Sequence, residues 1–197
     1  ANPGQTILEV ARANNKYIPA LCYMEGLSTV GACRLCMVEV SGVARLVPAC
    51  TTIVQEGQAV ATTSAQLESY RKIALELLFA ERNHVCSACV ANGHCELQTM
   101  AYSHGMDHVR YDYCYPKWSL DLSHPLYGMD HNRCILCTRC VRFMRDIGGE
   151  AFIRIDPRPQ RGRQIHALPD LAERQAERRA EAVPGRRPRK QTAHPPP

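Results

Sequence analysis

Aromatic side chains and long apolar runs are both scarce in this sequence of 197 residues. Phe, Trp and Tyr make up 6% of the chain, which predicts a small hydrophobic core. The longest apolar run, IALELLFA, contains Glu76 and is too short to cross a bilayer. The first residues show no charged segment followed by an apolar one, as a signal peptide would. We therefore expect a soluble, cytoplasmic protein without membrane insertion.

A basic face suited to nucleic acid is also missing. The net charge is +5, but residues 1–156 are close to neutral and the basic excess lies in residues 157–197. That segment contains no aromatic residue, whereas nucleic-acid-binding faces commonly interleave basic and aromatic side chains. We expect no nucleic-acid binding. No catalytic acid, base or nucleophile can be recognised either, so any reaction is expected to depend on cofactors.

Cysteine, in contrast, is abundant, with eleven residues. Disulfides in an oxidising compartment and metal-binding thiolates in a reducing one are the two competing interpretations. Two residues separate the members of four cysteine pairs: Cys33 and Cys36, Cys86 and Cys89, Cys134 and Cys137, Cys137 and Cys140. Such short loops are poor structural disulfides and natural chelates, so the spacing favours a metalloprotein.

The first cysteine group consists of Cys22, Cys33, Cys36 and Cys50. Four thiolates are the ligand set of a 2Fe–2S cluster, and three ligands on one loop with a distant fourth are typical of plant-type ferredoxins. The first gap is longer here than in that motif. Gly31 and Ala32 precede the close pair, and small residues let the backbone approach a cluster and direct N–H groups at its sulfurs. A zinc site of four cysteines is the alternative.

The second group places His84, Cys86, Cys89 and Cys95 within twelve positions. An imidazole in place of one thiolate makes a cluster less negative and easier to reduce. We interpret the group as the ligands of a 4Fe–4S cluster, with His94 as the second candidate for the histidine. A zinc site of three cysteines and one histidine is the alternative.

The third group is Cys134, Cys137 and Cys140. Three cysteines at this spacing open the bacterial ferredoxin motif for a 4Fe–4S cluster, in which a further cysteine precedes a proline. The sequence supplies no such cysteine, so this is a partial 4Fe–4S motif without its fourth ligand. The one unassigned cysteine, Cys114, lies upstream in DYCYP and is expected to be a free thiol.

Hydrophobic periodicity predicts a few short elements between the cysteines. The stretch PGQTILEVARANN predicts a turn and an amphipathic helix, and CMVEVSG and ARLVPACTTIV predict two strands joined at Gly42. Thr63 and Gln66 suggest a capping box for a second helix that ends near Asn83. One face of that helix is expected to carry the apolar residues Leu67, Tyr70, Ile73, Ala74, Leu77 and Leu78. Residues 101–133 are expected to be mostly loop.

Four arginines lie beside the cysteines in the sequence: Arg34, Arg133, Arg139 and Arg142. A positive charge near a cluster can stabilise its reduced form, and the same side chains could meet acidic surfaces of a partner. Ordinary solvated charges are the alternative interpretation.

Taken in order, the cysteine motifs resemble a known family. The matching stretches are YIPALCY, GACRLCMVEV and PACTT, then NHVCSACVANGHCELQ, then DHNRCILCTRCVRF, within residues 3–145. They resemble the small iron–sulfur subunit of the diaphorase part of cytoplasmic NAD-reducing nickel–iron hydrogenases. They are also similar to the amino-terminal region of the largest hydrophilic subunit of respiratory complex I and to iron-only hydrogenases. Only Val85 separates His84 from Cys86, which is similar to the NAD-reducing hydrogenase branch.

This resemblance implies an α+β fold in successive parts. Residues 1–63 would form a β-grasp 2Fe–2S ferredoxin domain, residues 64–115 a 4Fe–4S domain with one histidine and three cysteine ligands, and residues 116–156 a partial ferredoxin-like 4Fe–4S segment. The family's β-grasp domain opens with a strand hairpin, whereas this chain opens at the helix that follows, so we expect that hairpin to be missing.

The resemblance also implies a function as a non-catalytic electron-transfer subunit. The chain would relay electrons between a flavoprotein diaphorase subunit, which carries FMN and binds NAD(H), and the small subunit of a nickel–iron hydrogenase. A fragment of complex I or a related NADH dehydrogenase, a fragment of an iron-only hydrogenase, and a zinc-binding interaction module without a redox role are the alternatives.

Residues 157–197 form a basic tail with nine Arg, eight Pro and six Ala and without cysteine. Such a composition cannot bury enough apolar surface to fold, which predicts disorder. The resemblance, however, implies a Cys-Pro pair in this region, and an Arg/Pro/Ala bias is typical of a GC-rich gene read out of register. A second interpretation is therefore that the chain leaves its reading frame after about Phe143, in which case the third cluster binds weakly or not at all.

Overall fold

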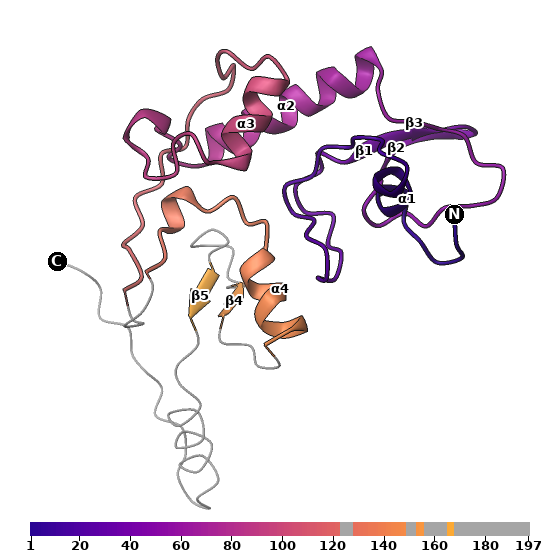
Figure 1. Ribbon diagram of the computed structural model, residues 1–197. Helices are drawn as coiled ribbons and strands as arrows, with labels where there is room; N and C mark the ends of the chain where they lie inside the picture. The colour runs from indigo at the N-terminus through magenta and orange to yellow at the C-terminus, as the bar shows by residue number, and fades with distance from the viewer. Residues whose placement is uncertain (123–127, 149–152, 156–164, 168–197) are drawn as a thin grey trace, which may run out of the picture.

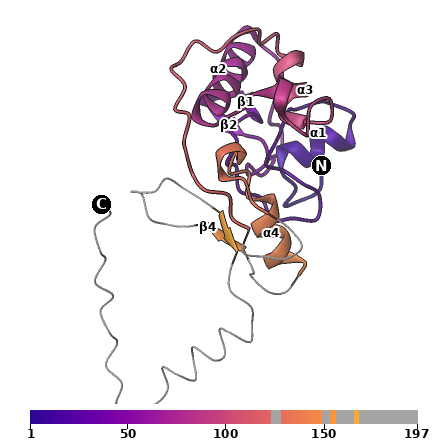
Figure 2. The ribbon, with the colours of Figure 1, turned by 90° about the vertical axis from the view of Figure 1, so that its left-hand side faces the viewer.

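The computed structural model describes residues 1–122, 128–148, 153–155 and 165–167. Figure 1 shows a sheet with helix α1 beside it, helices α2 and α3 packed together, and helix α4 further along the chain. In the view turned by 90°, α4 lies directly beneath the part that holds α1 and the sheet (Figure 2). Among the described residues, no helix has the length and apolar character needed to span a membrane.

The first part of the chain is a helix packed on a small antiparallel sheet. Helix α1 (Ile7–Ala13) begins at Thr6, whose side chain accepts a hydrogen bond from the Glu9 N–H (3.3 Å), while the Glu9 carboxylate accepts one from the Thr6 N–H (2.7 Å). The sheet has the order β2-β1-β3 and consists of β1 (Met37–Val40), β2 (Val43–Pro48) and β3 (Val60–Ala61). The predicted first helix and strand pair are confirmed.

Two hydrophobic cores meet at the first cysteine group. One lies between α1 and the sheet and contains Ile7, Leu8, Val38 and Val40 together with Cys36 and Cys50. The other lies against α2 and α3 and contains Leu35, Leu75, Phe79 and Leu97 together with Cys22 and Cys33. The four thiols therefore lie where the sheet and the following helices join.

Helix α2 (Ala65–Glu81) forms where predicted but buries a different face. Its N-cap is Ser64 rather than Thr63, because the Ser64 hydroxyl accepts from the Leu67 N–H (3.2 Å) and also donates to the Glu39 carboxylate on β1. The buried positions are Leu67, Arg71, Leu75, Glu76, Phe79 and Ala80. Of the predicted apolar face only Leu67 is buried. The others, Tyr70, Ile73, Ala74, Leu77 and Leu78, line a surface groove, but Ala74 and Leu78 are also partly buried against the second core.

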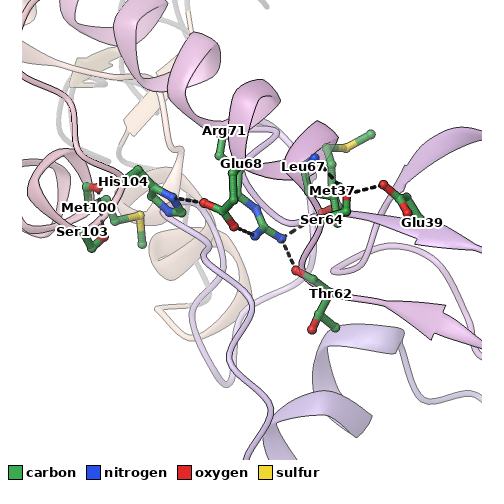
Figure 3. A network of polar contacts seen from close by, with 10 residues as sticks. All are labelled: Met37, Glu39, Thr62, Ser64, Leu67, Glu68, Arg71, Met100, Ser103 and His104. Carbon is green, nitrogen blue, oxygen red and sulfur yellow. Dashed lines mark hydrogen bonds and ion pairs between the residues drawn. The ribbon is translucent and has the colours of Figure 1, made fainter.

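Buried charges fix the observed face of α2. The Arg71 guanidinium donates to the Thr62 carbonyl (2.8 Å), the Met37 carbonyl (3.2 Å) and the Glu68 carboxylate (2.8 Å). Glu68 also contacts His104 Nδ1 (2.8 Å), so the network joins β1, α2 and the end of α3, as Figure 3 shows. Buried charges need such partners, and two members of the network, Met37 and His104, lie outside α2 and far from it in the sequence.

The remaining elements are short. A 3-10 turn (Cys86–Ala88) leads to helix α3 (Glu96–Ser103), and a second one (His131–Arg133) leads to helix α4 (Arg139–Asp146). Strands β4 (Ile153–Ile155) and β5 (Ile165–Ala167) pair antiparallel. The prediction of disorder for residues 157–197 is therefore wrong at β5, because this short segment pairs with a strand upstream of the tail. The rest of that tail lies outside the described residues.

Candidate metal centres

The fold gathers the four cysteines of the first group into a buried site. Their exposed fractions are 1% for Cys22, 8% for Cys33, 0% for Cys36 and 1% for Cys50, and none forms a disulfide. Hydrogen bonds between thiols link Cys33 to Cys22, Cys22 to Cys50 and Cys50 to Cys36. The loops after α1, before β1 and after β2 thus bring together residues that are up to 28 positions apart.

Hydrogen bonds in this site favour the thiolate form of two cysteines. Donation by the Cys33 and Cys50 thiols lowers the pKa of Cys22 to about 2, and the backbone amides of Cys33 and Ala32 add to this effect. Donation by Cys50 lowers the pKa of Cys36 to about 7. The pKa values of the donors, Cys33 and Cys50, are raised in turn. Thiolates are the ligands of iron and zinc, so the buried donor set fits a cluster.

The loop around the close pair has the backbone geometry expected of a cluster-binding loop. Gly31 has a φ of +61°, a conformation that favours glycine, and a side chain there would point at Thr51. Arg34, between Cys33 and Cys36, has a φ of +58° although it is not glycine. Such strain is typical of functional loops held by their surroundings. The amide of Ala32 pointing at the Cys22 sulfur agrees with the predicted role of these small residues.

The second group lines a cavity of about 420 Å³. His84, Cys86, Cys89 and Cys95 all contribute to its wall, between the end of α2 and the start of α3. His84 is half-buried, yet its Nε2 atom is shielded from solvent and has no hydrogen-bond partner. A buried polar atom without a partner calls for an explanation such as a bound ion or cofactor.

Burial of the imidazole, with the charges of Arg82 and Arg133, lowers the pKa of His84. The neutral ring that results is the form that binds metals. His94, the other candidate, is exposed and lines a separate surface pocket with Tyr17 and Met100. The geometry therefore favours His84 as the fourth donor of this group.

The third group lies next to the second. Cys137 lines the same cavity as His84, while Cys134 is half-buried and Cys140 is exposed. Leu136 and Thr138 have φ values of +54° and +60°, so this loop is strained like the loop at Arg34. The second group and Cys137 of the third group therefore line the same cavity, although the two groups are far apart in the sequence: Cys95 and Cys134 are separated by 39 positions.

Among the residues that the structure describes, no further ligand joins these groups. Cys114 is exposed, and its N–H donates to the Ala80 carbonyl (2.8 Å). In the described part of the chain, no three His, Cys, Asp or Glu side chains are arranged around a point that would hold a single metal ion. The predicted fourth cysteine of the third group is not found among the described residues.

Of the four arginines singled out in the sequence, three have intramolecular partners. Arg139 pairs with Glu96 (2.8 Å) and donates to the Tyr23 carbonyl (3.0 Å), which links all three cysteine groups. Arg142 is buried and donates to backbone carbonyls. Arg34 is exposed, and Arg133 pairs with Asp130 (3.2 Å).

The partners of these arginines were not predicted. Glu96 lies 43 positions from Arg139, and Ser28, whose carbonyl accepts from Arg142, lies 114 positions from it. No local sequence pattern marks either residue, because both contacts depend on how the chain folds back on itself. Correlated substitution of such pairs in related sequences is the signal that would find them.

Three family models match successive parts of the chain. Residues 1–65 match the 2Fe-2S iron-sulfur cluster binding domain, and residues 71–110 match the NADH-ubiquinone oxidoreductase-G iron-sulfur binding region. Residues 124–166 match the ferredoxin-like domain of NADH-quinone oxidoreductase subunit 3. The α+β fold class and the 2Fe–2S and 4Fe–4S clusters expected from the sequence are confirmed by these matches.

Individual proteins with similar sequences agree with these family matches. The chain is 39% identical over 143 residues to the gamma subunit of the NAD-reducing hydrogenase HoxS of Cupriavidus necator, a match that covers 73% of this chain and 60% of the relative. It is 37% identical over 150 residues to the alpha subunit of the NADPH-Fe(3+) oxidoreductase of Geobacter sulfurreducens, covering 76% of this chain but only 18% of that subunit. The chain thus spans three fifths or less of these relatives.

A solved structure extends the similarity to three dimensions. A chain in the crystal structure of an NAD+-reducing [NiFe]-hydrogenase in the H2-reduced state matches with a TM-score of 0.79 and 41% sequence identity. The match covers 85% of this chain and 70% of the other. By these similarities the chain belongs to the family of small iron–sulfur subunits of NAD-reducing nickel–iron hydrogenases, which is related to the iron–sulfur subunits of complex I.

Proposed function

We propose that this chain carries electrons through two complete iron–sulfur sites. The first would hold a 2Fe–2S cluster on Cys22, Cys33, Cys36 and Cys50. The second would hold a 4Fe–4S cluster on His84, Cys86, Cys89 and Cys95. Bound clusters supply reversible one-electron transfer, while the chain supplies ligands, burial and hydrogen bonds to their sulfurs. Cys134, Cys137 and Cys140 would form a third site that lacks one ligand.

The observation that carries this proposal is the state of His84. Its Nε2 atom is buried without a partner in the wall of a cavity that the three cysteines of the same group, and also Cys137, line. A histidine with only a packing role would place this nitrogen against water or a polar group. A ligand, in contrast, has its partner in the cofactor. The cavity of about 420 Å³ is also larger than one zinc ion requires.

The partners follow from the family rather than from the chain itself. We propose that a flavoprotein diaphorase subunit, with FMN and bound NAD(H), exchanges electrons with these clusters, and that the small subunit of a nickel–iron hydrogenase exchanges them at the other end. The chain itself would be the non-catalytic relay of an oxidoreductase. A complex I-like assembly is the second candidate, because residues 71–110 match the NADH-ubiquinone oxidoreductase-G iron-sulfur binding region.

Anaerobic purification of the full chain tests the proposal. We expect a brown protein that contains iron and acid-labile sulfide, with electron paramagnetic resonance signals from a 2Fe–2S and a 4Fe–4S cluster after reduction. Domain boundaries near residues 63 and 115 would be tested by expressing the two parts separately and assigning one signal to each. Stoichiometric zinc without sulfide would refute the proposal and favour a zinc-binding interaction module.

A further inference from the structure

Helix α4 fixes the loop that carries Cys22 through three arginines on one face, Arg139, Arg142 and Arg145. Arg139 donates to the Tyr23 carbonyl (3.0 Å), and Arg145 donates to the Ser28 hydroxyl. The Asp146 carboxylate accepts from the Ser28 N–H (2.8 Å). The third cysteine group is thereby held against the first, because α4 begins within the triplet loop.

Arg142 is the buried member of this face. It is 3% exposed, and its guanidinium donates to the carbonyls of Cys22, Ser28 and Cys137, the last at 3.2 Å. Its Nε–H donates to the Thr138 hydroxyl (3.0 Å). Two of these carbonyls belong to cysteines of different groups, so the guanidinium lies between the first and third sites.

Within the described ranges, no carboxylate balances the charge of Arg142. Arg139 pairs with Glu96 and Arg145 with Asp146, at 2.8 and 2.7 Å. All the hydrogen-bond acceptors of Arg142 in the described part of the chain are neutral. A buried cation without an anion is strongly unfavourable, and carbonyl dipoles offset only part of that cost.

The first cysteine group is a complete set of anionic ligands, and Arg142 contacts it through the Cys22 carbonyl. A cluster bound by four thiolates is negatively charged. We propose that Arg142 is the counter-charge of the 2Fe–2S cluster and a positioning residue that sets its reduction potential. This inference rests on the proposed function, namely that Cys22, Cys33, Cys36 and Cys50 bind that cluster.

The charge of Arg142 sets the direction in which it shifts the reduction potential of the cluster, and its burial sets the size of that shift. Reduction adds an electron to an anionic cluster, so a nearby cation stabilises the reduced form and raises the reduction potential. Inside the protein this interaction is weakly screened. Arg145, whose side chain is 59% exposed, contacts the same loop but is screened by water and paired with Asp146. It is therefore a matched control for the loss of one charge and one loop contact.

A redox titration of the 2Fe–2S signal, followed by electron paramagnetic resonance on the anaerobic full chain, tests this role. We expect Arg142→Gln to shift the midpoint to more negative potential, Arg142→Lys to restore most of the shift, and Arg145→Gln to leave the midpoint unchanged. Equal shifts in Arg142→Gln and Arg142→Lys would overturn the proposal, because geometry rather than charge would then be responsible. No shift in Arg142→Gln would overturn it as well.

Substitution of Thr138 tests the same idea while Arg142 is retained, in case Arg142→Gln does not fold. Thr138 has a left-handed backbone that Asp and Asn tolerate. Thr138→Asp offers the guanidinium a carboxylate, and we expect a more negative midpoint than in Thr138→Asn. Equal midpoints would overturn the proposal. Absence of any 2Fe–2S signal in the wild-type chain would refute the proposed function itself, whereas a signal that no variant moves would refute only the role of Arg142.

Discussion

Replacement of Arg71 by methionine should destabilise the junction between the sheet and the helices. Arg71 is 2% exposed, and it joins α2 to the carbonyl of Met37, which directly follows Cys36, and to the carbonyl of Thr62, which follows β3. Methionine keeps much of the side-chain volume but cannot donate. The change therefore removes hydrogen bonds to two carbonyls while it leaves the packing largely intact.

The expected loss follows from those contacts. A hydrogen bond from a charged donor contributes about 1.5–3 kcal/mol, and removal of one member of a buried charged network costs about 3–5 kcal/mol. The ion pair with Glu68 adds little, because the Glu68 side chain is 44% exposed. Two hydrogen bonds from a charged donor to buried carbonyls are lost, so we expect Arg71→Met to lower the free energy of unfolding by about 3–5 kcal/mol, equivalent to a fall of about 1–2 M in the urea midpoint.

Urea unfolding of the anaerobic full chain, followed by circular dichroism and cluster absorbance together, measures this loss. Arg45→Met, at an exposed position of β2, is the matched control and should change the free energy of unfolding by less than about 0.5 kcal/mol. Arg71→Lys should recover only part of the loss, because an ammonium group lacks the planar fork that spans both carbonyls. A stability of Arg71→Met equal to that of the wild type would refute the reasoning.

Two further outcomes are expected. His84→Cys should keep a cluster but lower its reduction potential, because a thiolate adds negative charge, while His94→Cys should not change it; an unchanged potential in both would count against ligation by His84. Burial raises the pKa of Glu68, but the hydrogen bond to His104 and the charge of Arg71 outweigh it, so the pKa lies below its ordinary value of 4.5. The stability that Glu68 contributes is therefore present above pH 4.5 and lost as the pH falls through the lower folded-state pKa, and Glu68→Gln should flatten the acid side of the stability curve. Urea midpoints measured across the acid range check this, and parallel curves would contradict it.

The cysteine groups could be predicted because the short spacing between cysteines in the sequence already indicates metal binding. Two cysteines separated by two residues can bind one cluster from a single loop, and the fold brings Cys33 and Cys36 into the same buried site, Cys33 beside Cys22 and Cys36 beside Cys50. The strands and the first helix could be predicted as well. For the helix the signal is local, since Thr6 and Glu9 form a cap within one turn. Contacts of this kind need no knowledge of the remaining chain.

The apolar face predicted for α2 matches the buried face only in part, for the opposite reason. Periodicity places apolar residues inside, but Arg71 and Glu76 are buried because of partners elsewhere in the chain. Arg110 donates to Glu76 (2.9 Å) from 34 positions away. Leu77 is 49% exposed in their place. A single sequence does not reveal which charged side chains acquire distant partners, and the same limit applies to the contacts of Arg142.

The third cysteine group leaves one prediction about the gene. A change of reading frame was predicted somewhere after about Phe143. The match to the ferredoxin-like domain, however, runs through residue 166, and β5 ends at Ala167, so the family pattern continues well beyond Phe143. Any change of frame therefore lies after residue 166. The ferredoxin motif requires a fourth cysteine, usually before a proline, which the residues after Cys140 do not supply. Translation of the other two frames of the same DNA beyond codon 166 should give a Cys-Pro pair in an otherwise open frame. Frames filled with stop codons and without such a cysteine would refute this explanation, and would leave either an incomplete third site or a fourth ligand from a partner subunit.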